Sequence, residues 1–169
     1  MVWRAGSLLA SRHDRLADFV SPKVVSLEFG EYWGKFGAML KVTELDQIAH
    51  ARLADAQALL EAGRYDGAVY ICGYAVEIAL KARICKTLSW PGYPSTRPEF
   101  QDLQSFRTHN LDVLLRVSGV EENIKTKAFA EWSAVVAWDP EARYNPVGSA
   151  PPEHAKLMVE SAQALLEVL

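Results

Sequence analysis

The stretch YDGAVYICGYAVEIALKARICKTL, from Tyr65 to Leu88, restricts the fold more than any other part of the chain. It is apolar on almost every side as far as Ala82, and it is too long and too rich in alanine for a β-strand. A helix that is hydrophobic all round has to be covered by neighbours on every side. The stretch therefore predicts the central helix of a bundle.

Four further segments have the apolar spacing that is typical of amphipathic helices. The first extends from Thr43, a predicted N-cap, to Gly63, a predicted stop. The others are a short helix that ends at Gly119, a helix over residues 124–136, and a terminal helix that begins after Pro151–Pro152. No segment reads as a convincing strand. We therefore predict an all-α fold, an up-and-down bundle of about five helices.

Residues 89–107 contain three prolines and are predicted to be irregular. Arg97 and Arg107 alternate there with aromatic residues, a composition that can hold single-stranded nucleic acid by charge and stacking. Glu99 and Asp102 weaken that signal, so we favour a surface loop packed by its own aromatic side chains. These are Trp90, Tyr93, Phe100 and Phe106.

The chain is divided here into an N-terminal extension of uncertain structure, residues 1–38, and a helical domain, residues 39–169. The extension mixes glycine and aromatic residues without a sustained period. Two explanations stay open, an upstream choice of start codon ahead of Met39 and a native extension that lays Trp33 and Phe36 on the bundle. N-terminal mass spectrometry of the native protein distinguishes them.

Charge and cysteine content restrict the class of protein. A net charge of −3 argues against bulk attraction to nucleic acid, although a local basic patch is compatible with it. Cys72 and Cys85 lie in one predicted helix about 20 Å apart, far beyond disulfide reach. No apolar run reaches the ~20 residues of a membrane span. We expect a cytoplasmic protein with no membrane association.

Three fragments of the chain have recognisable spacing. The most specific is GRYDGAVYICGYAVEIALKARI, which contains Gly63, Tyr65, Ala68, Ala75, Glu77, Leu80 and Lys81. HNLDVLL follows it, and RYN comes later, before a terminal amphipathic helix. In this order the fragments resemble the HEPN family (higher eukaryotes and prokaryotes nucleotide-binding): HNLDVLL is similar to its His-x-Leu helix start, and RYN to its C-terminal half.

The resemblance implies a helical bundle that often dimerises. Many members are RNases whose cleft lies between protomers, and many are encoded beside a nucleotidyltransferase in toxin–antitoxin or phage-defence modules. Others bind RNA or nucleotides without catalysis. We therefore expect a homodimer, and a nucleotidyltransferase, RNA or a nucleotide as its partner.

HEPN nucleases place a His four to six residues after an Arg, so that a guanidinium holds the phosphate while an imidazole moves a proton. No Arg–His pair of this chain has that spacing, and ten residues separate Arg143 from His154. Tyr144 follows the arginine, with the polar Asn145 one residue later. The intervening prolines and glycine permit a tight return that brings Arg143 and His154 together. The alternative is a solvated His154 and a structural ion pair for Arg143.

Glu77 lies on a nearly all-apolar helix and needs a partner if it is buried. We expect Arg143 to be that partner, with Lys81, one turn on, as the local alternative. Glu77 then has a structural role, or else it lines a ligand cleft. His109, beside Arg107 at a helix start, either binds an anion or simply caps or packs at the turn. The tyrosines of this helix, Tyr65, Tyr70 and Tyr74, are expected in the core or an interface.

The leading hypothesis is a HEPN-like binding or interaction domain. The first alternative is a divergent metal-independent endoribonuclease that uses Arg143 with His154 or His109, and the second is a structural homodimeric bundle. No phosphate-binding loop, D-x-D pair or clustered Cys/His set occurs, so we expect no cofactor and no metal. The candidates for lining a ligand cleft are Glu77, Lys81, Arg107, Arg143, Tyr144 and Asn145.

Overall fold

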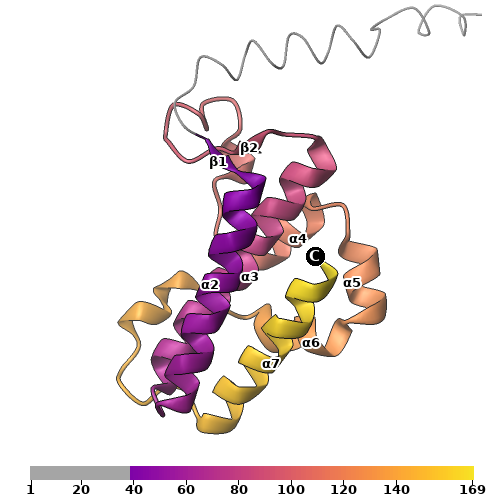
Figure 1. Ribbon diagram of the computed structural model, residues 1–169. Coiled ribbons are helices and arrows are strands. Elements are labelled where there is room, and N and C mark those ends of the chain that lie inside the picture. Colours follow the sequence, from indigo (N-terminus) through magenta and orange to yellow (C-terminus); the bar gives the residue numbers. More distant parts are fainter. Residues whose placement is uncertain (1–38) are drawn as a thin grey trace, which may run out of the picture. The chain divides into compact units, whose positions relative to one another are not determined.

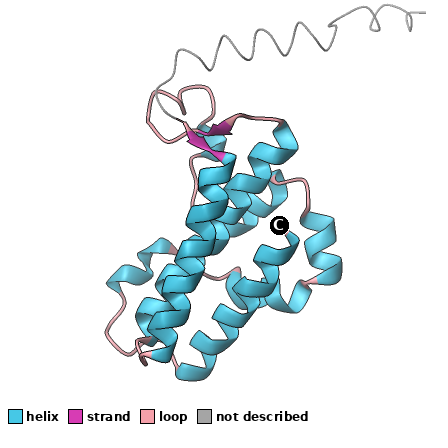
Figure 2. Cartoon of the chain, in the orientation of Figure 1, coloured by secondary structure: helices cyan, strands magenta, loops and turns pink. Residues whose placement is uncertain are grey.

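The computed structural model describes residues 39–169. These residues form a mostly helical bundle with one small antiparallel sheet, so the predicted all-α fold class is confirmed (Figures 1 and 2). The elements in chain order are β1 (Leu40–Lys41), α2 (Val42–Glu61), α3 (Tyr65–Leu88), β2 (Gly92–Tyr93), the 3₁₀-helix η1 (Gln104–Phe106), α4 (Leu111–Val117), α5 (Glu121–Lys127), α6 (Phe129–Val135), the 3₁₀-helix η2 (Pro140–Tyr144) and α7 (Pro152–Val168).

The central helix is α3, which has the predicted bounds and packs against α2, α7 and α4. Its small residues let these neighbours approach closely, and its buried positions lie on every side of the helix. In Figure 1, α2 and α3 run side by side and α7 flanks them. The strongest amphipathic pattern of the sequence is also confirmed, since α7 buries Ala155, Met158, Val159, Ala162 and Leu165.

The C-terminal end of α2 agrees with the prediction, and its N-terminal end does not. Gly63 has φ = 68°, a conformation that favours glycine, and it ends the helix as expected. The predicted N-cap at Thr43 is wrong, because the helix begins at Val42 and Lys41 takes the cap position. The Lys41 backbone N–H donates to the Glu44 carboxylate at 2.9 Å, so an acidic side chain in the first turn satisfies the helix start.

The expectation of a strand-free chain is corrected by β1 and β2. Leu40 pairs with Tyr93 and Lys41 pairs with Gly92 in an antiparallel ladder at the end of the bundle where α2 begins (Figure 2). A Cβ at position 92 would lie 2.5 Å from the Leu40 carbonyl oxygen, so only glycine permits this approach. Strands of two residues are too short to leave a periodic pattern in the sequence.

The helix predicted over residues 124–136 is broken into α5 and α6. Ala128 lies at the break with φ = −138° and ψ = 38°, and it is neither proline nor glycine, so no breaker residue marks the site. Ile124 on α5 and Trp132 on α6 are both buried in the core. Phe129, which the predicted stripe placed inside, is 62% exposed.

The loop after α3 is packed by its own aromatic residues, as predicted. Tyr93 and Phe100 are buried, and the Tyr93 hydroxyl donates to the Phe106 carbonyl at 2.5 Å. The rings of Trp90 and Phe106 meet edge to face at 4.9 Å. Glu99 is buried as well, and its carboxylate accepts hydrogen bonds from two backbone N–H groups of the same loop. The loop is therefore packed and hydrogen-bonded by its own residues.

Residues 1–38, with Trp33 and Phe36, lie outside the described residues, and the division of the chain at residue 39 stays a prediction. Cys72 and Cys85 are both free and buried. Within residues 39–169, no helix combines the length and the apolar character needed to cross a membrane.

Candidate functional site

Glu77 is a buried acidic residue of α3 that contacts two other polar side chains. It is 2% exposed, and its carboxylate lies 2.5 Å from Lys81 Nζ and 3.0 Å from His109 Nδ1. The local alternative partner, Lys81, is thus confirmed. The expected pairing of Glu77 with Arg143 is wrong, since His109 takes that place from the start of α4.

Arg143 is held by its own helical turn, which explains why it does not reach Glu77. Its guanidinium donates to the Pro140 carbonyl at 3.0 Å and to the Glu141 carboxylate at 2.7 Å, and it lies over the Tyr144 ring at 4.6 Å. Hydrogen bonding to Tyr144 raises the pKa of Arg143, with smaller contributions from Glu141 and from Tyr70. A 3₁₀ turn brings side chains at this spacing back onto their own backbone.

His109 has a defined orientation. Both oxygens of the Glu77 carboxylate lie 3.0 Å from Nδ1, so this nitrogen donates and Nε2 points away from the pair. The His109 side chain is 58% exposed. Asn110, not His109, caps α4, because its side chain accepts from the Val113 N–H at 3.0 Å. His109 is therefore free of a capping role and presents an open ring nitrogen to solvent.

A pocket of about 370 Å³ opens beside this pair and is called here the Lys81 pocket. Its charged side chains, Lys81 and Arg107, are both cations, and its other polar groups are the His109 imidazole and hydroxyl groups; the remaining walls are apolar. Lys81 Nζ lies 5.3 Å from the centre of the Tyr93 ring, a cation–π contact. The pocket is lined by Leu40, Leu45, Ile48, Ile78, Lys81, Tyr93, Pro94, Ser95, Phe100, Arg107, Thr108 and His109. It brings together three of the residues that the sequence marked.

Tyr74 connects this region to a second pocket. Its ring meets His109 at 6.5 Å and Trp138 at 4.9 Å, both edge to face. The hydroxyls of Tyr70 and Tyr74 lie 3.4 Å apart, and this hydrogen bond together with burial raises the pKa of Tyr74 to about 12. Tyr65, Tyr70 and Tyr74 are all half-buried, and an interface role for them stays a prediction.

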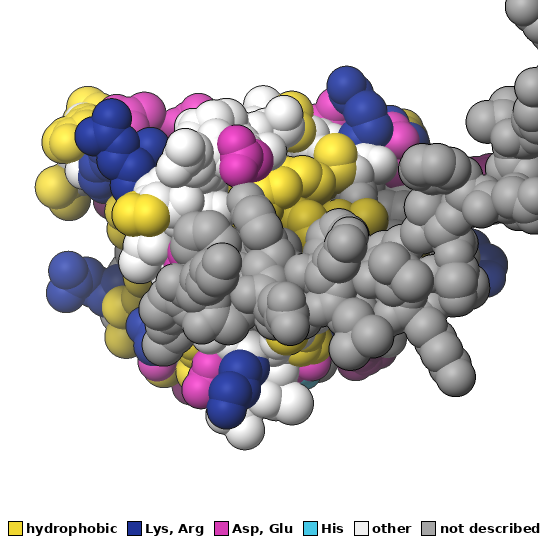
Figure 3. All heavy atoms as spheres, turned by 90° about the horizontal axis from the view of Figure 1, so that it is seen from above, with side chains coloured by type: hydrophobic (Ala, Val, Ile, Leu, Met, Phe, Trp, Pro, Cys, Tyr) yellow, Lys and Arg dark blue, Asp and Glu magenta, His cyan; other side chains and the backbone are white. Residues whose placement is uncertain are grey.

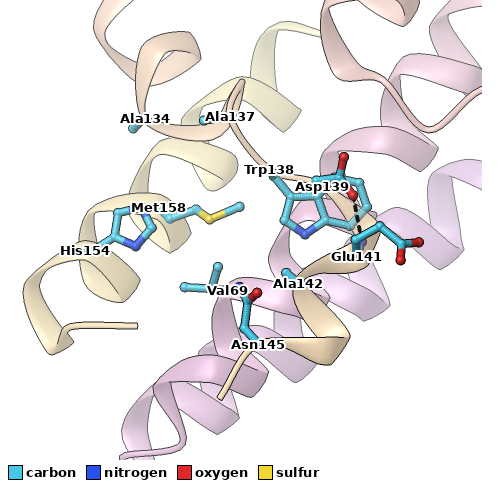
Figure 4. A pocket seen from close by; sticks show the side chains of 10 residues that line it. All are labelled: Val69, Ala134, Ala137, Trp138, Asp139, Glu141, Ala142, Asn145, His154 and Met158. Atoms are coloured by element: carbon cyan, nitrogen blue, oxygen red, sulfur yellow. Dashed lines mark hydrogen bonds between the residues drawn. The ribbon is translucent and has the colours of Figure 1, made fainter. Parts of the chain in front are cut away.

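His154 and Asn145 lie at the second pocket, called here the Trp138 pocket, which has a volume of about 310 Å³ (Figure 4). Its lining residues are Val69, Ala134, Ala137, Trp138, Asp139, Glu141, Ala142, Asn145, His154 and Met158. In the part of the chain that the structure describes, no hydrogen bond joins Arg143 to His154 or His109. Arg143 and Tyr144 line neither pocket.

On the face of the bundle that carries the sheet, the visible charges are mixed. Figure 3, seen from the end of the bundle that carries the sheet, shows lysine and arginine side chains in separate groups with acidic ones between them. Arg107 makes no ion pair within residues 39–169, whereas the Lys81 charge is balanced by Glu77. Among the same residues, no group of three or more His, Cys, Asp or Glu side chains has the arrangement of a metal site.

Sequence reasoning missed Trp138, which joins α3 to the second pocket. One signal was present in the glycine at position 73, inside an otherwise well-formed helix. A Cβ there would lie 2.1 Å from the Trp138 ring, so only glycine leaves room for the indole to pack against α3. The pairing of Glu77 with His109 had no local signal, because the two residues lie far apart in the chain.

Comparison with known proteins supports the resemblance seen in the sequence. The family model of the HEPN domain matches residues 42–97. The match covers α2, α3 and β2 and includes Glu77 and Lys81, whereas His109 and Arg143 lie beyond it. The resemblance to the HEPN family is thereby confirmed over residues 42–97, and the two later fragments lie beyond the match. No curated protein and no solved structure matches the chain.

Proposed function

Since the chain shares the α2–α3 part of the HEPN family, we propose that it binds RNA or a nucleotide, with a phosphate group seated at the Lys81 pocket. The observation that carries the proposal is the buried Glu77 carboxylate, which holds Lys81 on one side and His109 on the other. Such fixed groups need no reorganisation when an anion arrives.

The charge of the pocket suits one phosphate group. Glu77 offsets the charge of Lys81, which leaves Arg107 as the unpaired cation and His109 Nε2 as a hydrogen-bonding group. Guanidinium groups bind phosphate oxygens through two parallel N–H donors. The apolar wall, which includes Ile78 and Phe100, can cover a base or a ribose. A single seated phosphate agrees with a protein of net charge −3.

A binding test compares two arginine variants. Fluorescence anisotropy with labelled single-stranded RNA and with a labelled nucleotide should show that Arg107→Ala weakens binding about tenfold at low salt, with a smaller salt dependence. Arg116→Ala removes one charge from an exposed pair with Asp112 and is the matched control. An equal loss of affinity in the two variants would show that only overall charge matters and that Arg107 forms no specific site. Wild-type protein that binds neither probe would overturn the proposal.

A second candidate function is metal-independent RNA cleavage. The observation that favours it is the orientation of His109, whose Nδ1 faces a carboxylate while Nε2 stays open for proton transfer. It ranks second because Arg143 is committed to Glu141. Cleavage of a broad RNA panel by the wild type, lost in His109→Ala and retained in His50→Ala, an exposed histidine on α2, would establish it. A wild type that leaves the whole panel intact would exclude it.

Partners are proposed on the family resemblance alone. We propose a homodimer and, as a further partner, a separately encoded nucleotidyltransferase in a toxin–antitoxin or defence module. Light scattering of the purified full chain tests the first. An adjacent nucleotidyltransferase gene, followed by co-purification of the two products, tests the second.

A further inference from the structure

The Trp138 pocket contains a buried donor that nothing in the described structure satisfies. Trp138 Nε1 is closed to solvent and has no hydrogen-bond partner, although buried donors are nearly always paired. We propose that this pocket is a second binding site, for an uncharged nucleobase, and that a ring nitrogen or carbonyl of the base accepts from Nε1. The inference extends the proposed RNA or nucleotide binding and rests on it for the identity of the ligand.

The shape of the pocket suits a flat ring system. In Figure 4, the indole nitrogen of Trp138 faces the space between Val69, Met158 and Asn145, and His154 lies on the far side of that space. A volume of about 310 Å³ accommodates a base with its ribose. Met158 has a flexible thioether side chain, which can turn aside and admit the ligand to Nε1.

The polar groups at the mouth match the edge of a base. Asn145 offers an amide that both donates and accepts, and His154 offers a ring nitrogen of either kind. Together with Nε1 they provide donors and acceptors around an apolar cleft, which is how proteins read the Watson–Crick edge of an unstacked base.

The charges at the mouth select against a phosphate at this site. Asp139 and Glu141 both line the pocket. The Arg143 guanidinium balances Glu141, while the Asp139 carboxylate accepts the Glu141 backbone N–H (dashed line in Figure 4). One carboxylate charge is left unbalanced, which repels an anion at short range. The pocket therefore takes the base, and a phosphate is held elsewhere.

The indole is fixed in place before any ligand arrives. Its ring packs on position 73 of α3, where a Cβ would lie 2.1 Å away, and the Tyr74 ring meets it edge to face at 4.9 Å. Tyr74 also meets His109 of the Lys81 pocket. Tyr74 thus contacts one lining residue of each pocket, His109 and Trp138.

The test observes the Trp138 indole N–H directly. A ¹⁵N–¹H spectrum of the full chain is titrated separately with adenosine, guanosine, cytidine and uridine, and Trp138→Phe assigns the resonance. We expect at least one nucleoside to shift this resonance in a saturable manner. Asn145→Ala should weaken that binding about tenfold, whereas Asn123→Ala, an exposed asparagine on α5, should leave it unchanged.

The failure of this inference can be told apart from failure of the proposed function. If none of the four nucleosides shifts the Trp138 resonance while RNA still binds through Arg107, the base site is disproved and the Lys81 pocket stands. If nucleosides shift the Trp138 resonance but Arg107→Ala leaves RNA binding intact, the phosphate site at the Lys81 pocket is disproved and the base site stands. A shift caused by inorganic phosphate alone would overturn the assignment to an uncharged ligand.

Discussion

Both carboxylate oxygens of Glu77 lie 3.0 Å from Nδ1 of His109, although the two residues belong to α3 and to the segment before α4. This contact joins the core helix to an exposed imidazole. The buried carboxylate also holds Lys81, so one acidic group organises a cation and an imidazole at the same pocket. Breaking the cluster from its buried end should therefore cost more than breaking it from its exposed end.

Replacing the buried carboxylate should destabilise the protein strongly. Glu77→Ala leaves Lys81, which is itself largely buried, without its partner, and the expected loss in the free energy of unfolding is about 3 kcal/mol. Glu121→Ala breaks an exposed pair with Lys125 at the same i,i+4 spacing and should cost about 0.5 kcal/mol or less. Urea unfolding of the two variants measures the difference. Equal, small losses would show that Glu77 contributes no more than a surface residue.

The helices were predictable from the sequence because buried positions on a helix repeat about every 3.6 residues. The sequence patterns identified α3 with its bounds and the buried stripe of α7. They did not reveal the break at Ala128, where no glycine or proline interrupts the pattern. They also missed the sheet, whose strands are only two residues long and depend on the close backbone approach at Gly92.

The candidate site was predictable only where its contacts are local. The pair Glu77–Lys81 follows from helical spacing alone. His109 reaches the same cluster because the loop of residues 89–107 brings it back to α3. That loop is irregular, so no periodic sequence pattern predicts where it leads. Arg143 was misplaced because a 3₁₀ turn folds its guanidinium back onto Pro140 and Glu141.

The glycine beneath Trp138 should not tolerate a methyl group. In Gly73→Ala the new Cβ would lie 2.1 Å from the indole ring, which has to move, and the expected cost is about 1–3 kcal/mol. The helix propensity of alanine offsets less than about 1 kcal/mol of this cost. Gly67→Ala, on the same helix, meets only Leu59 at 3.4 Å and should be neutral or slightly stabilising. Thermal unfolding compares them, and equal melting temperatures would contradict the packing argument.

Asp66 of α3 hydrogen-bonds the backbone of the segment between η2 and α7. Its carboxylate accepts from the Gly148 N–H at 2.6 Å and from the Ala150 N–H at 2.8 Å, and these hydrogen bonds lower its pKa below the usual value of 3.8. A lowered pKa in the folded state means that the contribution to stability is present above about pH 4 and is lost as the pH falls through the folded pKa.

The Asp66 contact can be followed at its two backbone donors. We expect the Gly148 and Ala150 amide resonances to shift together on acidification, with a midpoint below pH 3.8, the usual pKa of the group. Asp66→Asn keeps one oxygen but removes the charge, so both resonances should lose this titration. A midpoint at or above the usual pKa, or an unchanged titration in Asp66→Asn, would show that another group controls the segment.

The thiols of α3 should be unreactive in the folded protein. Cys72 and Cys85 are fully buried, and burial raises the pKa of each thiol to about 12. At pH 8 about one thiol in ten thousand is then ionised, and the thiolate is the reactive form. A chromogenic disulfide reagent should label neither cysteine of the native protein within minutes, and both in 6 M guanidinium chloride, about the concentration that unfolds most domains. Prompt labelling of either thiol in the native state would mean that α3 opens locally, which is incompatible with its place at the centre of the bundle.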